Sequence, residues 1–202
     1  EEYEVPQKRK RIIIVGVAKH INKNFCIPAP LIRKNKNKVS NYITAYQAIN
    51  CPKINKKTKN HEPVKNSQRV IERLKRIKPG ENAFTAKKLK NNKKLKLKNT
   101  KTTISQIYKR LKRDEPSYTV TGSGGGGTHM YHWNENRALT NRERARLQTF
   151  PDSFEFIGNR DSQRKQIGMA VPVKGAEAIF RALLKTHVGL KYPTCTPNIN
   201  LK

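Results

Sequence analysis

The stretch NRALTNRERARLQTFPDSF, residues 136–154, contains the clearest local structural signals in the chain. Thr140 and Glu143 have the spacing of a capping box, in which each side chain satisfies a backbone N–H group at the start of a helix. Pro151 predicts the end of that helix, because proline has no N–H to donate and its ring clashes with the preceding turn. Composition alone favours a capped, solvated, arginine-rich helix, which is a common element.

Two further sequence blocks, one near each end of the chain, accompany this stretch. The stretch YEVPQKRKRIIIVG, residues 3–16, places Gln-x-Arg-x-Arg before an apolar run, and QIGMAVP occupies residues 166–172. In this order, and with a variable stretch between the first two, the three blocks resemble the eighth, ninth and tenth sequence blocks of the DNA cytosine-5 methyltransferases. The variable middle of the chain corresponds to the family's target-recognition region.

The formal charge of +30 is concentrated in the first part of the chain. Residues 1–120 contain 32 Lys and Arg against 8 Asp and Glu, whereas residues 121–202 contain 12 against 6. Such an excess indicates a polyanionic partner, because neutralising phosphates releases condensed counterions and favours binding whatever the sequence. A general drift toward Lys and Asn is the alternative, and it accounts for part of the excess, for instance in residues 93–98.

No apolar run approaches the length of a membrane span and no secretory leader is found. We therefore expect a cytoplasmic protein of bacterial type, held at the nucleoid through DNA, with no membrane partner. Cys26, Cys51 and Cys195 are widely spaced and form no CxxC pair, which favours reduced thiols. A zinc site that combines two of them with His129 and His132 is the alternative, but no ligand spacing supports it, and we expect no metal.

Hydrophobic patterns predict the remaining elements. Residues 11–17 form a continuous β-branched run, typical of a strand buried on both faces of a parallel α/β sheet. Residues 172–187 carry an apolar stripe that includes Phe180 and Leu184, and Gly189 is placed to end that helix. Other elements are expected as follows: helices at 43–49, 67–77 and 103–111, a strand at 117–121, and a disordered tail at 191–202.

The glycine run GSGGGG, residues 122–127, allows three interpretations. It satisfies G-x-G-x-x-G after a strand, but a dinucleotide loop requires an apolar helix immediately afterwards, and residues 128–133 are not amphipathic. A flexible linker is compatible with the composition. We favour a third interpretation, in which backbone without side chains lies close against DNA. Residues 118–121 and 131–132 flank the run as in members of the resembled family.

The resemblance implies a specific chemistry. Members of that family transfer a methyl group from S-adenosylmethionine to C5 of a cytosine flipped out of duplex DNA, because the ring atom cannot be reached inside the stack. A cysteine thiolate adds to C6 and a glutamic acid acts at N3. The Pro-Cys, Glu-Asn-Val and cofactor-binding Phe-x-Gly-x-Gly blocks are absent from this sequence. Since the chain also begins at Glu1 inside a block, we expect a C-terminal part or split-enzyme subunit that needs an N-terminal half for activity.

The eighth block supplies three candidate residues under the resemblance. Gln7 and Arg9 are expected at the phosphates beside the flipped base, and Arg11 at the cytosine O2. Arginine suits both tasks, because it stays charged and offers a planar fork of donors to oxygen atoms.

The target-recognition segment supplies candidate DNA contacts. Thr119 and Thr121 are expected near the target base, and Gly122 and Gly124 are expected close to DNA in the same segment. No pattern in the sequence identifies the bases that are read, because that code depends on loop geometry.

The tenth block is expected to fold back beside the cofactor, with Met169, Ala170 and Val171 as cofactor-binding candidates. Met169 stands where the family usually has asparagine, so a cofactor contact there must rest on backbone or packing. In the ninth block three arginines could be either structural ion-pair partners or DNA contacts: Arg142, Arg144 and Arg146.

These observations predict an α/β fold, the C-terminal portion of a Rossmann-like S-adenosylmethionine-dependent methyltransferase with a small mixed α+β target-recognition domain. The predicted function is site-specific DNA (cytosine-5) methylation in a restriction-modification system, together with an N-terminal half. The alternative is a non-catalytic basic DNA-binding protein, including an inactive relic of the enzyme. The expected divisions are a catalytic-domain strand at 1–18, the recognition domain at 19–135, a hinge helix and C-terminal helix at 136–190, and the tail at 191–202.

Overall fold

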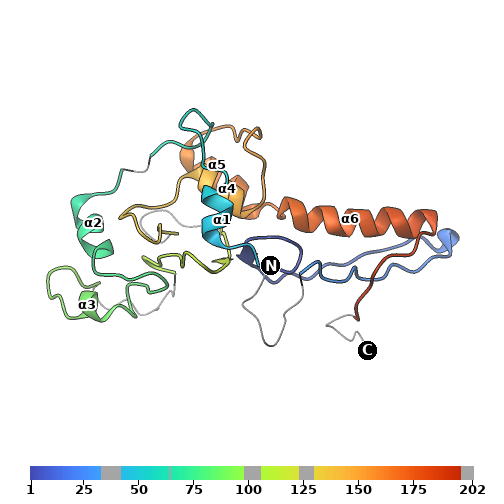
Figure 1. The fold of residues 1–202 in the computed structure, drawn as a ribbon, viewed down its shortest axis with the longest axis horizontal. Helices are drawn as coiled ribbons and strands as arrows, with labels where there is room; N and C mark the ends of the chain where they lie inside the picture. The colour runs from blue at the N-terminus through green and yellow to red at the C-terminus, as the bar shows by residue number, and fades with distance from the viewer. Residues whose placement is uncertain (33–41, 64, 98–105, 123–129, 197–202) are drawn as a thin grey trace.

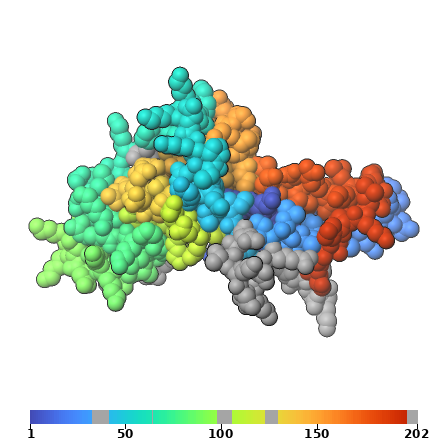
Figure 2. Space-filling view, in the orientation of Figure 1, coloured from blue at the N-terminus to red at the C-terminus, as the bar shows by residue number. Residues whose placement is uncertain are grey.

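The computed structural model describes residues 1–32, 42–63, 65–97, 106–122 and 130–196. These residues form a body and an arm (Figure 1). The body contains helices α1 to α5, and the arm consists of helix α6 (Val173–Val188) with residues 10–30 beside it. The space-filling view shows the same division, with the arm projecting from one side of the body (Figure 2).

A short parallel pair of strands lies near the centre of the molecule. Strand β1 (Gln7–Lys8) pairs with β2 (Ser117–Tyr118), so that Gln7 lies opposite Ser117 and Lys8 opposite Tyr118. The strand expected at residues 117–121 is therefore confirmed for its first two residues.

The prediction of a buried strand over residues 11–17 is wrong. These residues have no regular secondary structure, and Ile12 and Ile14 are 75% and 90% exposed. A β-branched run forms a buried strand only where neighbouring strands complete its hydrogen bonds and other layers cover its faces. Among the described residues no strand pairs with this run. Its apolar side chains therefore lie on the surface of the arm.

Helices α1 (Ala45–Asn50), α4 (Asn141–Leu147) and α5 (Arg160–Met169) contribute to the larger hydrophobic core. The predicted capping box of α4 is confirmed: Thr140 Oγ1 accepts the Glu143 N–H at 3.1 Å, and Glu143 Oε2 accepts the Thr140 N–H at 2.8 Å. The short helix expected at 43–49 is confirmed by α1. Apolar residues from several segments fill this core: Ile49, Leu111, Val120, Leu139, Leu147 and Ile167.

Helix α4 ends before the residue expected to stop it. The last helical residue is Leu147, and Thr149 has a left-handed backbone with φ of +60°. The chain has therefore left the helix before it reaches Pro151, so the expectation that this proline terminates the helix is wrong.

A smaller hydrophobic core joins α2 (Gln68–Leu74) and α3 (Lys87–Lys90). Helix α2 confirms the helix expected at 67–77, in a shorter form. The helix expected at 103–111 is wrong for residues 106–111, because the backbone there bonds to another segment. Leu111 N–H donates to the Tyr131 carbonyl at 2.9 Å, and Tyr131 N–H donates to the Lys109 carbonyl at 3.1 Å. Residues 103–105 lie outside the described residues.

Helix α6 confirms the predicted C-terminal helix, but the cover of its apolar stripe and the structure of the tail differ from the prediction. Gly189 ends α6 with φ of +78°, the left-handed conformation that favours glycine. The expected apolar stripe is only partly covered, since Phe180 and Leu184 are exposed. The expected disorder of the tail is wrong for residues 191–196, because they pair with residues 27–29 along two backbone hydrogen bonds. Residues 197–202 lie outside the described residues.

None of the helices in the described part of the chain is long and apolar enough to cross a membrane. A short 3₁₀ turn, η1 (Lys19–Ile21), stands at the tip of the arm beyond the end of α6 (Figure 1).

Candidate nucleic-acid interface

Gln7 belongs to the stretch that resembles the eighth block, and it lies where this stretch meets those that resemble the ninth and tenth blocks. Successive strand residues point to opposite faces, so Gln7 is buried while Lys8 is exposed. The Gln7 side chain is fully buried; its Oε1 accepts the Val120 N–H at 2.8 Å and its Nε2 donates to Gln148 Oε1 at 2.9 Å. A buried amide with these partners connects the residues after β2 to the residue after α4.

Gln148 extends this connection to the end of α5. Its Nε2 donates to the Ile167 carbonyl at 2.7 Å, and the residue is fully buried. Since Gln148 also accepts from Gln7, two side-chain amides join β1, β2, α4 and α5 without a charged group. Buried amides stabilise such a junction only while their partners stay in place, because an unpaired buried amide is costly.

Arg9 makes a second connection between the same segments. Its guanidinium donates to the Val120 carbonyl at 2.9 Å, and more weakly to the carbonyls of Gly168 and Ala170 at 3.3 and 3.4 Å. Burial and, secondarily, repulsion from Arg11 lower the pKa of Arg9. The planar fork of arginine suits this arrangement, because it can serve carbonyl groups from two segments at once.

The three candidate residues of the eighth block differ in how accessible their side chains are. The expectation for Gln7 as a phosphate contact is wrong in this structure, because its side chain has no exposed surface. Arg9 is half-buried and already bonded to carbonyl groups. Arg11 is exposed, and its guanidinium donates to the neighbouring Lys10 carbonyl at 2.7 Å. Of the three, Arg11 has the guanidinium that is most available to a nucleic acid.

The predicted recognition residues leave β2 directly beside this junction. Thr119 Oγ1 donates to the Lys8 carbonyl at 2.9 Å, and Thr121 is half-buried. Gly122 packs on α5, where an added Cβ would lie 2.7 Å from the Lys165 carbonyl oxygen. The absence of a side chain at Gly122 is therefore required by the body itself, and its proximity to DNA stays a prediction. Gly124 lies outside the described residues.

The cofactor candidates lie at the turn between α5 and α6. Met169 and Val171 are 72% and 66% exposed, whereas Ala170 is half-buried and its carbonyl accepts from Arg9. The two exposed side chains are apolar, so they can contribute packing to a cofactor pocket but no polar contact. This fits the expectation that Met169 cannot replace the hydrogen bonds of an asparagine.

The three arginines of α4 are structural in this fold. Arg142 is fully buried and donates to backbone carbonyls of other segments, including that of Lys59 at 3.0 Å. Burial lowers the pKa of Arg144 to about 10. Arg146 pairs with Asp152, with Nε 2.9 Å from Oδ1. These contacts favour the structural interpretation over DNA contact.

Arg110 has a structural role that no sequence signal indicated. It is buried between the two hydrophobic cores and donates to the carbonyls of Leu74, His132 and Glu135, each at 2.9 Å. Burial lowers the pKa of its guanidinium. Its spacing in the sequence is unremarkable, because all of these partners come from distant segments.

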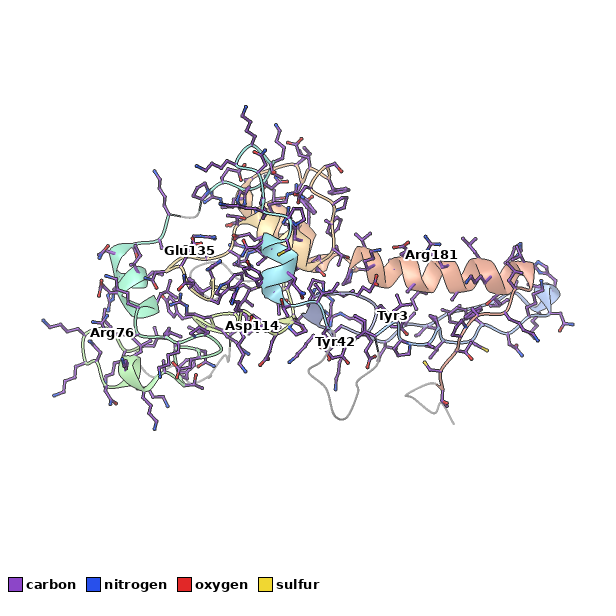
Figure 3. All side chains as sticks on the ribbon, in the orientation of Figure 1. Tyr3, Tyr42, Arg76, Asp114, Glu135 and Arg181 are labelled. Atoms are coloured by element: carbon purple, nitrogen blue, oxygen red, sulfur yellow. The ribbon has the colours of Figure 1, made fainter. Side chains whose placement is uncertain are left out.

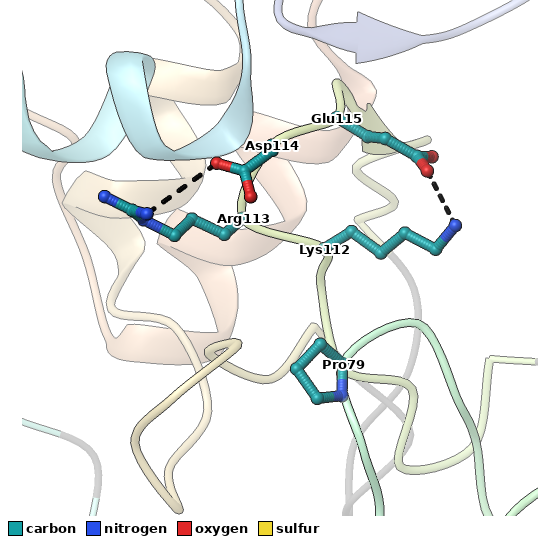
Figure 4. Close-up of a pocket in the computed structure, with 5 residues that line it drawn as sticks. All are labelled: Pro79, Lys112, Arg113, Asp114 and Glu115. Atoms are coloured by element: carbon teal, nitrogen blue, oxygen red, sulfur yellow. Dashed lines mark hydrogen bonds and ion pairs between the residues drawn. The ribbon is translucent and has the colours of Figure 1, made fainter.

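A surface hollow beside β2 has no feature of a ligand site. It is lined by Pro79 and residues 112–115 (Figure 4). Lys112 pairs with Glu115 at 2.6 Å and Arg113 lies 3.9 Å from Asp114, so the cations of the lining are matched by its own carboxylates.

The thiols and histidines form no metal site among the described residues. Cys26 and Cys51 are exposed, Cys195 is half-buried, and no group of three potential metal ligands gathers in this part of the chain. His132 instead stacks on Trp133, with ring centroids 4.0 Å apart. His129 lies outside the described residues.

Comparison with solved structures finds a related fold. The crystal structure of a prophage-encoded protein from E. coli, described as a DNA modification methyltransferase, has a TM-score of 0.65 at 20% identity. The match covers 92% of this chain and 57% of that chain. The mixed α/β fold is therefore confirmed, and a larger Rossmann-like sheet stays a prediction.

Comparison of sequences then identifies the family. The profile of the C-5 cytosine-specific DNA methylases matches residues 1–185. Type II methyltransferase M.BbvI of Brevibacillus brevis is 52% identical over 194 residues, 96% of this chain and 49% of that protein. Type II methyltransferase M.AquIB of Picosynechococcus sp. is 36% identical over 136 residues, 62% of this chain and 86% of that protein. The chain belongs to the C-5 cytosine-specific DNA methylases, and it spans about half the length of the first curated relatives that it matches.

Proposed function

We propose that this chain is the C-terminal, target-recognising part of a DNA (cytosine-5) methyltransferase of a restriction-modification system, acting on duplex DNA in the bacterial cytoplasm. The observation that carries the proposal is the junction of Gln7, Arg9 and Gln148. This junction holds the strand of the eighth block against the residues after β2, the residue after α4 and the turn of the tenth block. Arg11 and the residues after β2 therefore extend from the same junction.

The proposed partner is an N-terminal catalytic half that supplies the cysteine and glutamate absent from this sequence. Exposed apolar side chains along the arm support it, because a large apolar surface usually marks an interface. They lie on the run beside α6, at the turn before it and on α6 itself: Ile12, Ile13, Ile14, Met169, Val171, Phe180 and Leu184. M.AquIB, of which this chain matches 86%, shows that a chain of comparable length carries the name of a methyltransferase.

In the assembled enzyme each accessible residue would have a distinct task. S-adenosylmethionine, bound mainly by the N-terminal half, would supply the methyl group for C5 of a flipped cytosine. Arg11 would donate to the cytosine O2 and orient the base. Thr119, Thr121 and the glycine segment that begins at Gly122 and includes Gly124 would contact DNA near the target. Met169, Ala170 and Val171 would form an apolar wall beside the cofactor.

Transfer of tritium from labelled S-adenosylmethionine to duplex DNA tests this proposal. We expect no incorporation with the chain alone, and incorporation once an N-terminal half carrying the Pro-Cys and Glu-Asn-Val blocks is added. Incorporation by the chain alone would contradict the proposal that this chain lacks the catalytic nucleophile. A mixture that binds DNA but transfers nothing would favour the non-catalytic DNA-binding alternative.

Arg11→Ala tests the assigned role within the active mixture, and Lys10→Ala is the matched control, since Lys10 is also exposed and carries the same charge. Loss of a positioned charged donor should reduce the single-turnover rate on the order of a hundredfold. DNA affinity should change little more than in the control. Equal rates for the two variants would remove Arg11 from the site.

A further inference from the structure

The segment from α3 onward carries a dense set of lysines on its surface. Residues 87–96, which we name the lysine loop, contain six lysines and no Asp or Glu. All six lysine residues are exposed: Lys87, Lys88, Lys90, Lys93, Lys94 and Lys96. Figure 3 shows side chains projecting from this end of the body, around the labelled Arg76.

The lysine loop is held in a defined shape. Leu89 is fully buried in the smaller hydrophobic core, so the single turn of α3 has one face fixed and its lysines outside. Arg73 Nε donates to the Leu95 carbonyl at 2.8 Å, and Asn92 Oδ1 accepts the N–H groups of Lys94 and Leu95 at 3.1 and 3.0 Å. The spacing of the exposed charges is therefore set by the fold.

The charge of the lysine loop is not neutralised within the described part of the chain. The ion pairs of lysine there involve other residues, and the neighbouring helix α2 shows the contrast: Glu72 pairs with Lys75 at 2.7 Å and with Arg76 at 3.0 Å. The loop also stands at the end of the body farthest from the arm (Figure 1). A partner on the arm would therefore leave it open.

We infer that the lysine loop is a phosphate-binding surface for duplex DNA, separate from the segment that follows β2. This inference rests on the proposed function and adds a second contact region to it. Lysine is a compact, strongly hydrated charge that binds phosphate without fixed geometry, so such a surface contributes affinity and no sequence information. It would neutralise phosphates of the duplex beyond the bases contacted by the residues that follow β2.

Binding of the 202-residue chain to a random-sequence DNA duplex, measured over a range of salt concentrations, tests the inference. The test variant combines Lys87→Gln, Lys88→Gln and Lys90→Gln. Each lost phosphate contact lowers the slope of log affinity against log salt by about one, so we expect a decrease of about three. At moderate salt the affinity should fall by about ten- to a hundredfold.

A second triple variant is the matched control. Lys53→Gln, Lys56→Gln and Lys57→Gln make the same change in net charge on another exposed loop of the body, also without ion pairs among the described residues. We expect this control to retain nearly the full salt slope. Equal losses in the two triple variants would mean that only total charge matters, and would overturn the inference.

Lysine acetylation in the presence and absence of the duplex tests the same inference on the chain without substitutions. We expect DNA to protect lysines 87, 88 and 90 and to leave lysines 53, 56 and 57 reactive. Protection of neither set would overturn the inference while leaving the methyl-transfer proposal intact. Failure of the chain to bind duplex DNA at all would overturn both. Tighter binding of single-stranded RNA than of duplex DNA, lost in the first variant, would assign the surface to RNA.

Discussion

Gly168 and Gly175 provide a sharp test of how the three blocks pack. Both are helical glycines, one near the end of α5 and one in the first part of α6. A Cβ built at Gly168 would lie 1.9 Å from the Gly122 nitrogen and 2.1 Å from the Thr121 carbonyl carbon. A Cβ at Gly175 would have its nearest neighbour, a Val5 methyl, at 3.8 Å, an ordinary contact.

The two substitutions should change the free energy of unfolding in opposite directions. In a helix interior alanine is favoured over glycine by about 1 kcal/mol, so Gly175→Ala should raise the free energy of unfolding by up to about that amount. Gly168→Ala has the same intrinsic gain, but its methyl group meets backbone atoms that cannot rotate away. Overpacking of this kind costs about 1–3 kcal/mol or more. We expect a net loss of about 2 kcal/mol for Gly168→Ala, and a difference between the variants of about 3 kcal/mol.

Urea denaturation of the 202-residue chain measures both changes. The midpoint should fall for Gly168→Ala and rise slightly for Gly175→Ala, with the m-value unchanged, because an altered m-value would signal a different folded or unfolded state. If Gly168→Ala were as stable as Gly175→Ala, the backbone of residues 121–122 would not cross α5 at this point. The proposed junction of the recognition segment with the tenth block would then lose its geometric basis.

Two further outcomes follow from buried polar groups. His132 Nδ1 accepts the N–H groups of Asn134 and Glu135, and burial lowers the pKa of His132. The unfolded state therefore binds the proton more readily, and the free energy of unfolding should fall as the pH drops below about 6.5, the ordinary value. His132→Asn, whose Oδ1 cannot be protonated there, should flatten this dependence in urea titrations; an unchanged slope would exclude His132 as its source. Glu143→Gln keeps the shape of the capping box but removes the charge that pairs with Arg137 at 2.7 Å. Thermal or urea unfolding should show a free energy of unfolding lower by about 1–3 kcal/mol. An unchanged free energy of unfolding would mean that the ion pair contributes nothing to stability.

Local signals were sufficient to predict the best-defined elements. The capping box of α4 depends on two residues three apart, and the end of α6 depends on the backbone freedom of Gly189. Both features involve interactions within one or two helical turns, so the neighbouring sequence is enough to indicate them. The strand expected at residues 11–17 failed for the opposite reason. A buried strand requires neighbours that the run itself does not contain, and the described residues offer none.

The candidate site shows the same limit. Gln-x-Arg-x-Arg points to this segment as a candidate, but the partners of Gln7 and Arg9 are Val120, Gln148 and the end of α5, more than a hundred residues away in sequence. Spacing could not reveal that the first two side chains of the block turn inward and only Arg11 remains exposed. The burial of the α4 arginines was equally hidden, because an arginine-rich helix has the same sequence whether it faces solvent or carbonyl groups.

The difference between arginine and lysine in this fold also changes the meaning of the net charge. Arg110, Arg142 and Arg144 are buried, and Arg9 is half-buried against carbonyl groups, whereas the lysines of the lysine loop are all exposed. Arginine suits the interior because its weakly hydrated, planar fork satisfies several acceptors, and lysine stays outside because its ammonium group is strongly hydrated. Buried arginines raise the formal charge but cannot release counterions from DNA. The salt dependence of DNA binding should therefore follow the exposed lysines of the lysine loop more than the total charge, and it should correspond to far fewer phosphates than the charge of +30 implies.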